Sequence, residues 1–200
     1  MCLLTEAICI ENGNALNLDF HRRRMARSRA ELGLGGKKNF SLRDIISVPD
    51  NLCNGKVKCR IVYDSDIRTV EYSPYHLREI CSLQLISDNH IDYQYKYVNR
   101  HEIDLLYRMR GNSDDILIVK NGLITDTSFT NIVFRAGEKW VTPARPLLQG
   151  TKRQFYLEQN LFYTADIRPE DLSQFDEARI INAMISLEES PAISIGNIRV

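Results

Sequence analysis

The order of hydrophobic and polar residues changes its period along the chain, and each change predicts a new element. Apolar and polar residues alternate from Leu3 to Ile10, which predicts a strand. From Leu18 to Leu32 apolar side chains recur at seven-residue spacing, which predicts a helix. Three glycines follow this segment and predict that the helix ends there: Gly33, Gly35 and Gly36. Four later segments are expected to form a short helix, the two strands of a hairpin and a further strand: 41–46, 56–63, 67–72 and 82–86.

A polar stretch at residues 87–90 marks the expected boundary between two domains. Tyrosines alternate with polar residues at 91–98, which predicts a strand with Lys96 on the face opposite the tyrosines. A helix is expected to begin at Asn99, with Glu102 completing a capping box. Strands are expected at 116–119, 123–127, 131–134, 140–143 and 177–183, and helices at 150–162 and from Pro169. The pattern predicts a mixed α and β fold in which antiparallel sheet dominates.

Composition and charge narrow the class of protein. The chain has 200 residues, a length that allows one large domain or two small ones. Its 26 basic and 26 acidic residues balance, which argues against a dedicated nucleic-acid binder or a protein attracted to anionic membranes. Five cysteines without paired spacing indicate reduced thiols and a cytoplasmic location. No apolar run approaches the roughly 18 residues of a membrane span, and no signal peptide is visible at the N-terminus.

Three basic residues at two places in the chain are candidates for chemistry. Lys96 could form a Schiff base with a carbonyl cofactor, or it could be a solvated lysine on an edge strand. Arg24 and His21 lie on one side of their helix beside its apolar stripe, and an arginine facing a core needs an anion such as a phosphate or a carboxylate. The alternatives for this basic run are a solvated face and, ranked last because the net charge is zero, a nucleic-acid patch.

Two further positions suggest anion and cation binding. Gly150 and Thr151 stand at a predicted helix start, where free amides bind phosphate, although Thr151 could equally be an ordinary N-cap. Asp126 lies among small hydroxyl residues in strand-like sequence, so it is either a buried carboxylate with a cationic partner or a turn aspartate satisfied by those hydroxyls. An amine, an arginine, a phosphate site and a carboxylate together are the groups that hold pyridoxal phosphate. The scattered histidines and cysteines predict no metal site.

Several motifs resemble the class IV aminotransferase family, the fold-type IV pyridoxal-phosphate enzymes. The matching segments are 122–134, Trp140-Val-Thr-Pro143, Leu147-Leu-Gln-Gly-Thr-Lys-Arg153 and Ile181-Asn182-Ala183-Met184. Upstream, His21-x-x-Arg24-Met25-x-x-Ser28 is similar to the family's His-x-x-Arg-Leu-x-x-Ser helix. Lys96-x-x-Asn99-Arg100 resembles the motif of the aminodeoxychorismate lyase branch.

The resemblance implies roles for individual residues. Lys96 would form the Schiff base with the cofactor and act as the catalytic base and acid, and Arg24 would bind the cofactor phosphate. Asp126 would face the pyridine nitrogen, where the family has a glutamate. The other implied cofactor-binding residues are Asn99, Ser128, Gly150, Thr151, Lys152, Asn182, Ala183 and Met184. Glu6 and Arg60 are expected to contact substrate, Arg60 through a carboxylate unless it forms a structural ion pair.

The resemblance also implies an architecture and a reaction. We expect a small N-terminal α/β domain at 1–87, a larger barrel-like domain at 91–200 and a homodimer. The motif around Lys96 favours 4-amino-4-deoxychorismate lyase, which forms p-aminobenzoate and pyruvate in the folate pathway. Ala7 stands where the lyase has a hydroxyl residue, and it favours the alternative of an aminotransferase acting on an amino acid and a 2-oxo acid. A shortened N-terminus leaves a non-catalytic, cofactor-binding family member as the lesser alternative.

Overall fold

The chain forms two compact units, which are described separately. The computed structural model describes residues 2–35 and 40–199. The first unit comprises Met1–Leu77 and Tyr95–Asn99, and the second comprises Arg78–Gln94 and Arg100–Val200. The division therefore falls earlier than the predicted boundary, because residues 83–87 pair with a strand of the second unit. Gly36, one of the glycines expected to end the first helix, lies outside the described residues.

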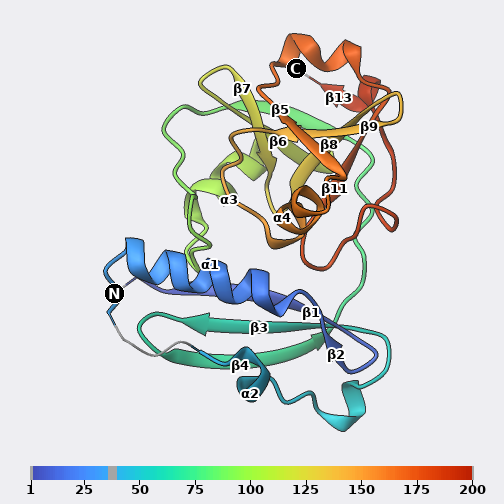
Figure 1. The fold of residues 1–200 in the computed structure, drawn as a ribbon. Helices are drawn as coiled ribbons and strands as arrows, with labels where there is room; N and C mark the ends of the chain where they lie inside the picture. The colour runs from blue at the N-terminus through green and yellow to red at the C-terminus, as the bar shows by residue number, and fades with distance from the viewer. Residues whose placement is uncertain (1, 36–39, 200) are drawn as a thin grey trace. The chain divides into compact units, whose positions relative to one another are not determined.

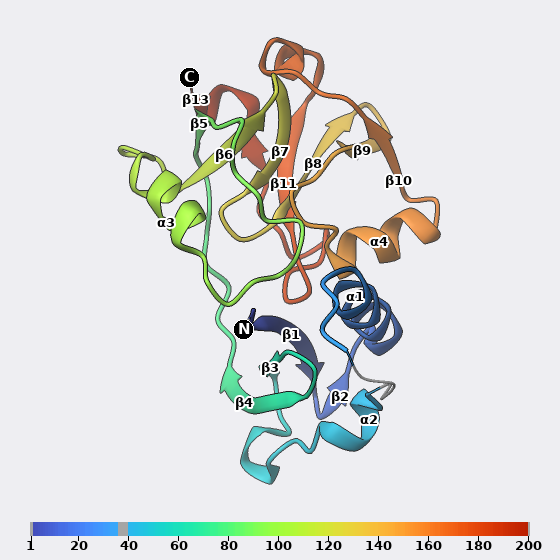
Figure 2. The same ribbon diagram turned by 90° about the vertical axis from the view of Figure 1, so that its left-hand side faces the viewer.

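The first unit is an antiparallel sheet with a helix across one face (Figures 1 and 2). Its strands follow the order β2-β1-β3-β4, and β1 pairs with β3 along its whole length. The elements are β1 (Leu4–Glu11), β2 (Asn14–Ala15), α1 (Leu18–Glu31), α2 (Leu42–Ile45), η1 (Asp50–Leu52), β3 (Lys56–Tyr63) and β4 (Ile67–Pro74). The sequence predictions for β1, α1, α2, β3 and β4 are confirmed to within two residues at each end.

Alternation along β1 and β3 places their apolar side chains under α1. Met25 of α1 packs with Ile8, Ile61 and Tyr63 in a core whose members are all buried. The seven-residue spacing seen in the sequence thus corresponds to the buried side of α1. Gly33 ends this helix with a φ of 60°, a conformation that glycine adopts without strain.

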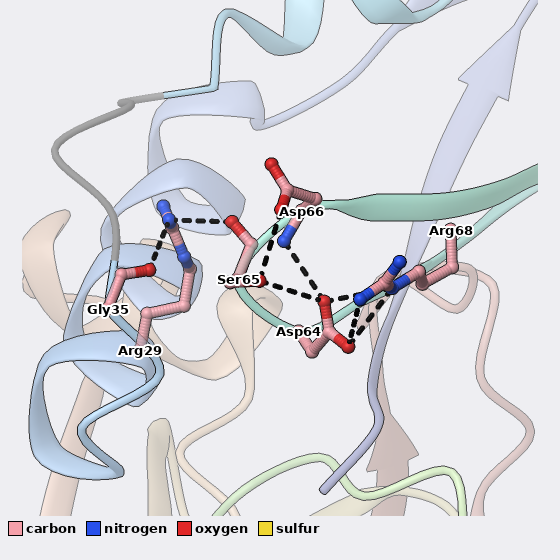
Figure 3. A network of polar contacts seen from close by, with 6 residues as sticks. All are labelled: Arg29, Gly35, Asp64, Ser65, Asp66 and Arg68. Carbon is pink, nitrogen blue, oxygen red and sulfur yellow. Dashed lines mark hydrogen bonds and ion pairs between the residues drawn. The ribbon is translucent and has the colours of Figure 1, made fainter. Parts of the chain in front are cut away.

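The turn between β3 and β4 is fixed by one buried carboxylate (Figure 3). Asp64 accepts hydrogen bonds from the backbone N–H of Asp66 at 3.0 Å and from Arg68 Nη2 at 2.8 Å. The Arg68 guanidinium holds the pKa of Asp64 below its usual value. Arg29, in the last turn of α1, donates from Nη2 to the Ser65 carbonyl at 2.9 Å. This hydrogen bond links the turn between β3 and β4 to α1.

The second unit is built on a nine-stranded sheet in which β8 is a branch point. The main path is β10-β9-β8-β7-β6-β5-β13, and β8 also pairs with β11, which pairs with β12. The strands are β5 (Leu83–Ser87), β6 (Asp115–Lys120), β7 (Leu123–Thr127), β8 (Asn131–Ala136), β9 (Lys139–Pro143), β10 (Phe162–Ala165), β11 (Glu177–Ile181), β12 (Ile193–Ser194) and β13 (Ile198–Arg199). The turn at Asn121-Gly122 is confirmed, with φ values of 52° and 76° that suit a type I′ hairpin.

The helices of the second unit differ at their ends from the predictions. They are α3 (His101–Arg108), α4 (Thr151–Glu158), η2 (Pro169–Gln174) and η3 (Ile195–Asn197). α3 packs against β6 and α4 against β10 (Figure 2). The predicted helix at 150–162 is too long, because Asn160 adopts a φ of 56° and strand β10 begins at Phe162. The predicted capping box at Asn99 is wrong, since Arg100 is the N-cap and Glu102 accepts from the Asp92 N–H instead.

The predicted strand at 91–98 is also wrong. Backbone N–H groups of this region donate to side chains and to carbonyls of local turns instead of to a neighbouring strand. Asp88 Oδ1 accepts from His90 N–H and Ile91 N–H at 2.7 and 3.1 Å. Further on, the Tyr97 N–H donates to the Tyr95 carbonyl at 2.9 Å and closes a tight turn. Only a single bridge, Leu4 to Tyr97, links the segment to β1. Within the described ranges, none of the helices combines the length and apolar character of a transmembrane segment.

Candidate active site

A buried triad of Glu6, His21 and Arg24 lies between β1 and α1 in the first unit. Arg24 Nε donates to Glu6 Oε1 at 2.9 Å, and Arg24 Nη2 donates to Glu6 Oε2. His21 Nδ1 lies 2.6 Å from Glu6 Oε2, and it must be the donor because an ionised carboxylate only accepts. The anion that the sequence required for Arg24 is thus supplied within the unit by a carboxylate.

The charges of the triad follow from its burial. Burial alone would raise the pKa of Glu6, but Arg24 and His21 outweigh it and lower that pKa to about 2. Burial lowers the pKa of His21, against the pull of Glu6, so the imidazole is neutral at pH 7. The Glu6 side chain is 0% exposed. This burial is at odds with the predicted contact to substrate and gives Glu6 the task of orienting Arg24.

Lys96 is held in the first unit by its backbone. Its carbonyl accepts from the Thr5 N–H at 2.9 Å, and the Val98 N–H donates to the Leu3 carbonyl at 2.9 Å, so the segment lies along β1. The Lys96 charge is close enough to lower the pKa of His21 further. The structure therefore brings the candidate amine to the region of the buried triad. Asn99, the other predicted cofactor ligand of this segment, is exposed.

Arg60 lies on the sheet face opposite the core of the first unit. It is the cross-strand partner of Ala7, and its Nη1 lies 3.1 Å from Glu71 Oε2. This ion pair is one of the two alternatives that the sequence left open for Arg60. Because the pair is partly exposed, it contributes little to stability. Binding of a substrate carboxylate by Arg60 stays a prediction.

The second unit contains a buried carboxylate at the end of β7. Asp126 Oδ1 accepts from Asn131 Nδ2 at 2.7 Å, and Asp126 Oδ2 accepts from the Leu148 N–H at 2.8 Å. The Asn131 amide also donates to the Leu148 carbonyl at 2.9 Å, which closes a ring of hydrogen bonds. Burial raises the pKa of Asp126 to about 6, although both neutral donors act against it. The acid is thus costly to ionise in the absence of a cationic partner at hydrogen-bond distance.

Helix α4 begins directly beside this ring. Gly150 is its N-cap, and Thr151 is its first residue and is buried, so the alternative of Thr151 as an ordinary N-cap is wrong. Lys152 follows on the same turn and is half-buried. The free amides of a helix start bind phosphate well, since they point along the axis with the positive end of the helix dipole.

Gly150 has no room for a side chain. A Cβ atom there would lie 1.9 Å from Asn131 Oδ1, so alanine would push the Asn131 amide away from Asp126 and Leu148. We expect Gly150→Ala to lower the free energy of unfolding by about 1–3 kcal/mol, as overpacking of a buried site does. Chemical denaturation measures this loss. Gly196→Ala is the matched control, because the nearest atom to its Cβ would be 3.8 Å away, and an equal loss in both variants would contradict the expectation.

A loop after β11 lies on the other side of the same region. Ile181, the last residue of β11, pairs with Asn131. Asn182 Oδ1 accepts from the N–H groups of Met184 and Ile185 at 2.8 and 3.0 Å, which shapes the loop that contains Ala183. The structure thus brings the predicted residues Asp126, Gly150, Thr151 and 182–184 together around β8. Ser128 is buried nearby, and its carbonyl accepts from Arg100 Nη2 at 2.7 Å.

Two buried residues of this region were not singled out from the sequence. Asn131 joins Asp126 to Leu148, and Arg153 donates to the Pro143 carbonyl at 2.8 Å while its charge lowers the pKa of Asp126. A polar residue that begins a strand of apolar residues was the available signal for Asn131. In the described part of the chain no group of three or more His, Cys, Asp or Glu residues could hold a metal ion.

Comparison with known proteins gives matches along nearly the whole chain. The family model described as amino-transferase class IV matches residues 3–188. An uncharacterized protein of Haemophilus influenzae is 40% identical over 185 residues, which is 92% of this chain and 98% of that protein. The crystal structure of a proposed 4-amino-4-deoxychorismate lyase from Haemophilus somnus is 34% identical, with a TM-score of 0.87 over 94% of this chain and 98% of that one. A proposed amino-acid aminotransferase from Mesorhizobium loti is 20% identical and shares the fold, with a TM-score of 0.79 over 97% and 98% of the two chains.

Proposed function

Because the chain belongs to the class IV aminotransferase family, whose fold is that of the fold-type IV enzymes, we propose that it is a pyridoxal-phosphate-dependent 4-amino-4-deoxychorismate lyase. The observation that carries the proposal is the similarity, at 34% identity over 94% of the chain, to the proposed lyase of Haemophilus somnus. Lys96-x-x-Asn99-Arg100 supports it, since this motif resembles that of the lyase branch. The net reaction splits the substrate into p-aminobenzoate and pyruvate and needs no second reactant.

The residues of the second unit fit pyridoxal phosphate. Asp126 is a buried acid that accepts hydrogen bonds from neutral donors, among them Asn131 and the Leu148 backbone. A protonated ring nitrogen would supply the cation that this acid lacks. Thr151 and the amides at the start of α4 would hold the phosphate, helped by Lys152 and the backbone of Ala183 and Met184.

The family resemblance implies roles for residues of the first unit as well. Bound pyridoxal phosphate supplies an electron sink for a carbanion next to the substrate amine. Lys96 would hold the cofactor covalently and then move a proton at the carbon that bears the amine. Arg24, whose guanidinium is oriented by Glu6, would contribute to phosphate binding, and Arg60 would donate hydrogen bonds to a substrate carboxylate.

Cofactor binding is the first test of this proposal. Protein incubated with pyridoxal phosphate and then freed of unbound cofactor should be yellow, and borohydride should fix the cofactor to Lys96, as measured by mass spectrometry of the tryptic peptides. A colourless protein without a modified lysine would leave only a non-catalytic member of the family. Labelling at another lysine would contradict the assignment of Lys96.

The reaction is tested with the loaded protein and 4-amino-4-deoxychorismate. We expect pyruvate, followed with lactate dehydrogenase and NADH, in a one-to-one ratio to p-aminobenzoate. The competing function is an aminotransferase, which is favoured by Ala7 in place of a hydroxyl residue and by the fold shared with the Mesorhizobium loti protein. Amino transfer to 2-oxoglutarate without pyruvate release from the chorismate would establish that function instead.

A further inference from the structure

A single side chain joins the acid of the second unit to the turn that begins α4. Asn131 gives both hydrogens of its amide to acceptors of the unit, the buried Asp126 Oδ1 at 2.7 Å and the partly buried Leu148 carbonyl at 2.9 Å. Its Oδ1 packs against Gly150, where no Cβ atom fits. Asn131 is 5% exposed, so its amide loses most of its access to water and depends on these hydrogen bonds.

The Leu148 backbone forms hydrogen bonds with both Asp126 and Asn131. Its N–H donates to Asp126 Oδ2 while its carbonyl accepts from Asn131. Both oxygens of Asp126 are therefore fixed, and the orientation of the carboxylate depends on Asn131 and on the backbone turn together. A shift of the turn and a rotation of the acid are coupled, because each would break a bond that holds the other.

The ionised form of Asp126 opposes the stability of the unit, although its hydrogen bonds are satisfied. Burial raises the pKa of Asp126, so ionising the acid at neutral pH opposes folding. An apolar residue of similar size would pack at this position without that cost. A ligand that needs the charge would account for an acid at this position and for the groups that orient it.

We infer that Asn131 is a positioning residue for the cofactor, with one amide that orients the Asp126 carboxylate and fixes the Leu148–Gly150 turn at the start of α4. The inference rests on the proposed function, because it takes pyridoxal phosphate as the ligand. Asn131 has no contact with the ring in this role and acts through Asp126 and the turn. The same side chain would then orient both the acid that binds the ring nitrogen and the turn that binds the phosphate.

Two substitutions separate this role from a general effect on folding. Asn131→Asp keeps the shape of the side chain but replaces the amide donor with an acceptor beside Asp126, and the added charge raises the pKa of that acid further. Asn131→Ser keeps one short donor and adds no charge. Asn197→Asp is the control, since Asn197 is an exposed residue of the same unit whose Nδ2 donates to the Cys81 carbonyl.

The measurements are the dissociation constant for pyridoxal phosphate and the pH midpoint of the absorbance change of the bound cofactor. We expect Asn131→Asp to raise the dissociation constant at least tenfold and to shift the midpoint by at least half a pH unit. Asn131→Ser should change both in the same sense by a smaller amount, and Asn197→Asp should match the wild type. Circular dichroism and thermal unfolding of the proteins without cofactor identify any variant that is not folded, and Asn131→Ser carries the test if Asn131→Asp fails to fold.

Two outcomes overturn the inference in distinguishable ways. If the wild type binds the cofactor and the folded Asn131 variants bind it with unchanged affinity and midpoint, the inference alone is wrong. If the wild type binds no pyridoxal phosphate, the proposed function fails and the inference fails with it.

Discussion

Replacement of Lys96 by alanine is expected to abolish covalent attachment of pyridoxal phosphate and to lower the rate of product formation by roughly 10²- to 10⁴-fold or more, the usual contribution of a general base. The backbone around Lys96 is fixed by main-chain bonds from Thr5 and to Leu3, which do not involve its side chain. The variant should therefore keep the fold of the first unit. The loss is measured as steady-state pyruvate release and as absence of the borohydride-fixed peptide.

A matched lysine and a chemical rescue make this prediction specific. Lys139→Ala removes an exposed lysine of β9 and should leave both readouts unchanged. Added methylamine should restore part of the rate of Lys96→Ala, because a free primary amine can take over the proton transfer but not the covalent link to the chain. Wild-type turnover by Lys96→Ala would show that another residue performs the chemistry.

Local signals in the sequence were sufficient for much of the fold. The Asn121-Gly122 turn and the alternation of β3 are strong short-range patterns, and both elements form where expected. The parallel pairing of β5 with β6 joins segments about thirty residues apart in sequence and carries no local signature. The alternating tyrosines at 91–98 were misleading, because Asp88 and turn contacts compete for the amides that a strand would need.

The sequence offered candidate residues for the site by their type, but it did not predict the contacts between them. Lys96, Asp126 and Thr151 became candidates because an amine, an acid and a helix start are recognisable in a linear pattern. The partner of Arg24 was not predicted, although the alternation of Leu4, Glu6 and Ile8 already places Glu6 on the apolar face of β1. An acid on such a face needs a buried cation, and this pairing between distant elements appears only when the chain is folded.

Replacement of Glu6 by glutamine is expected to lower the free energy of unfolding by about 3–5 kcal/mol at pH 7, the usual result of removing one partner of a buried ion pair. The substitution leaves the Arg24 guanidinium buried without its counter-charge and gives His21 Nδ1 a weaker acceptor. Glu31→Gln, an exposed change of the same charge at the end of α1, should stay within about 0.5 kcal/mol of the wild type. Urea denaturation at pH 7 measures both differences.

The pH dependence of this loss identifies the charge of Glu6 as its cause. In the native state Arg24 and His21 lower the pKa of Glu6 from 4.5 to about 2, a shift worth about 3 kcal/mol. A carboxyl whose pKa is depressed on folding stabilises the protein fully above its unfolded pKa, and the stabilisation fades as the pH falls through the native pKa. The gap between wild type and Glu6→Gln should therefore be widest above pH 5 and narrow between pH 4.5 and 2, because protonated Glu6 then resembles glutamine. A gap of constant size down to pH 2 would show that Glu6 acts through its shape and packing, and Arg24 would then need another source of its orientation.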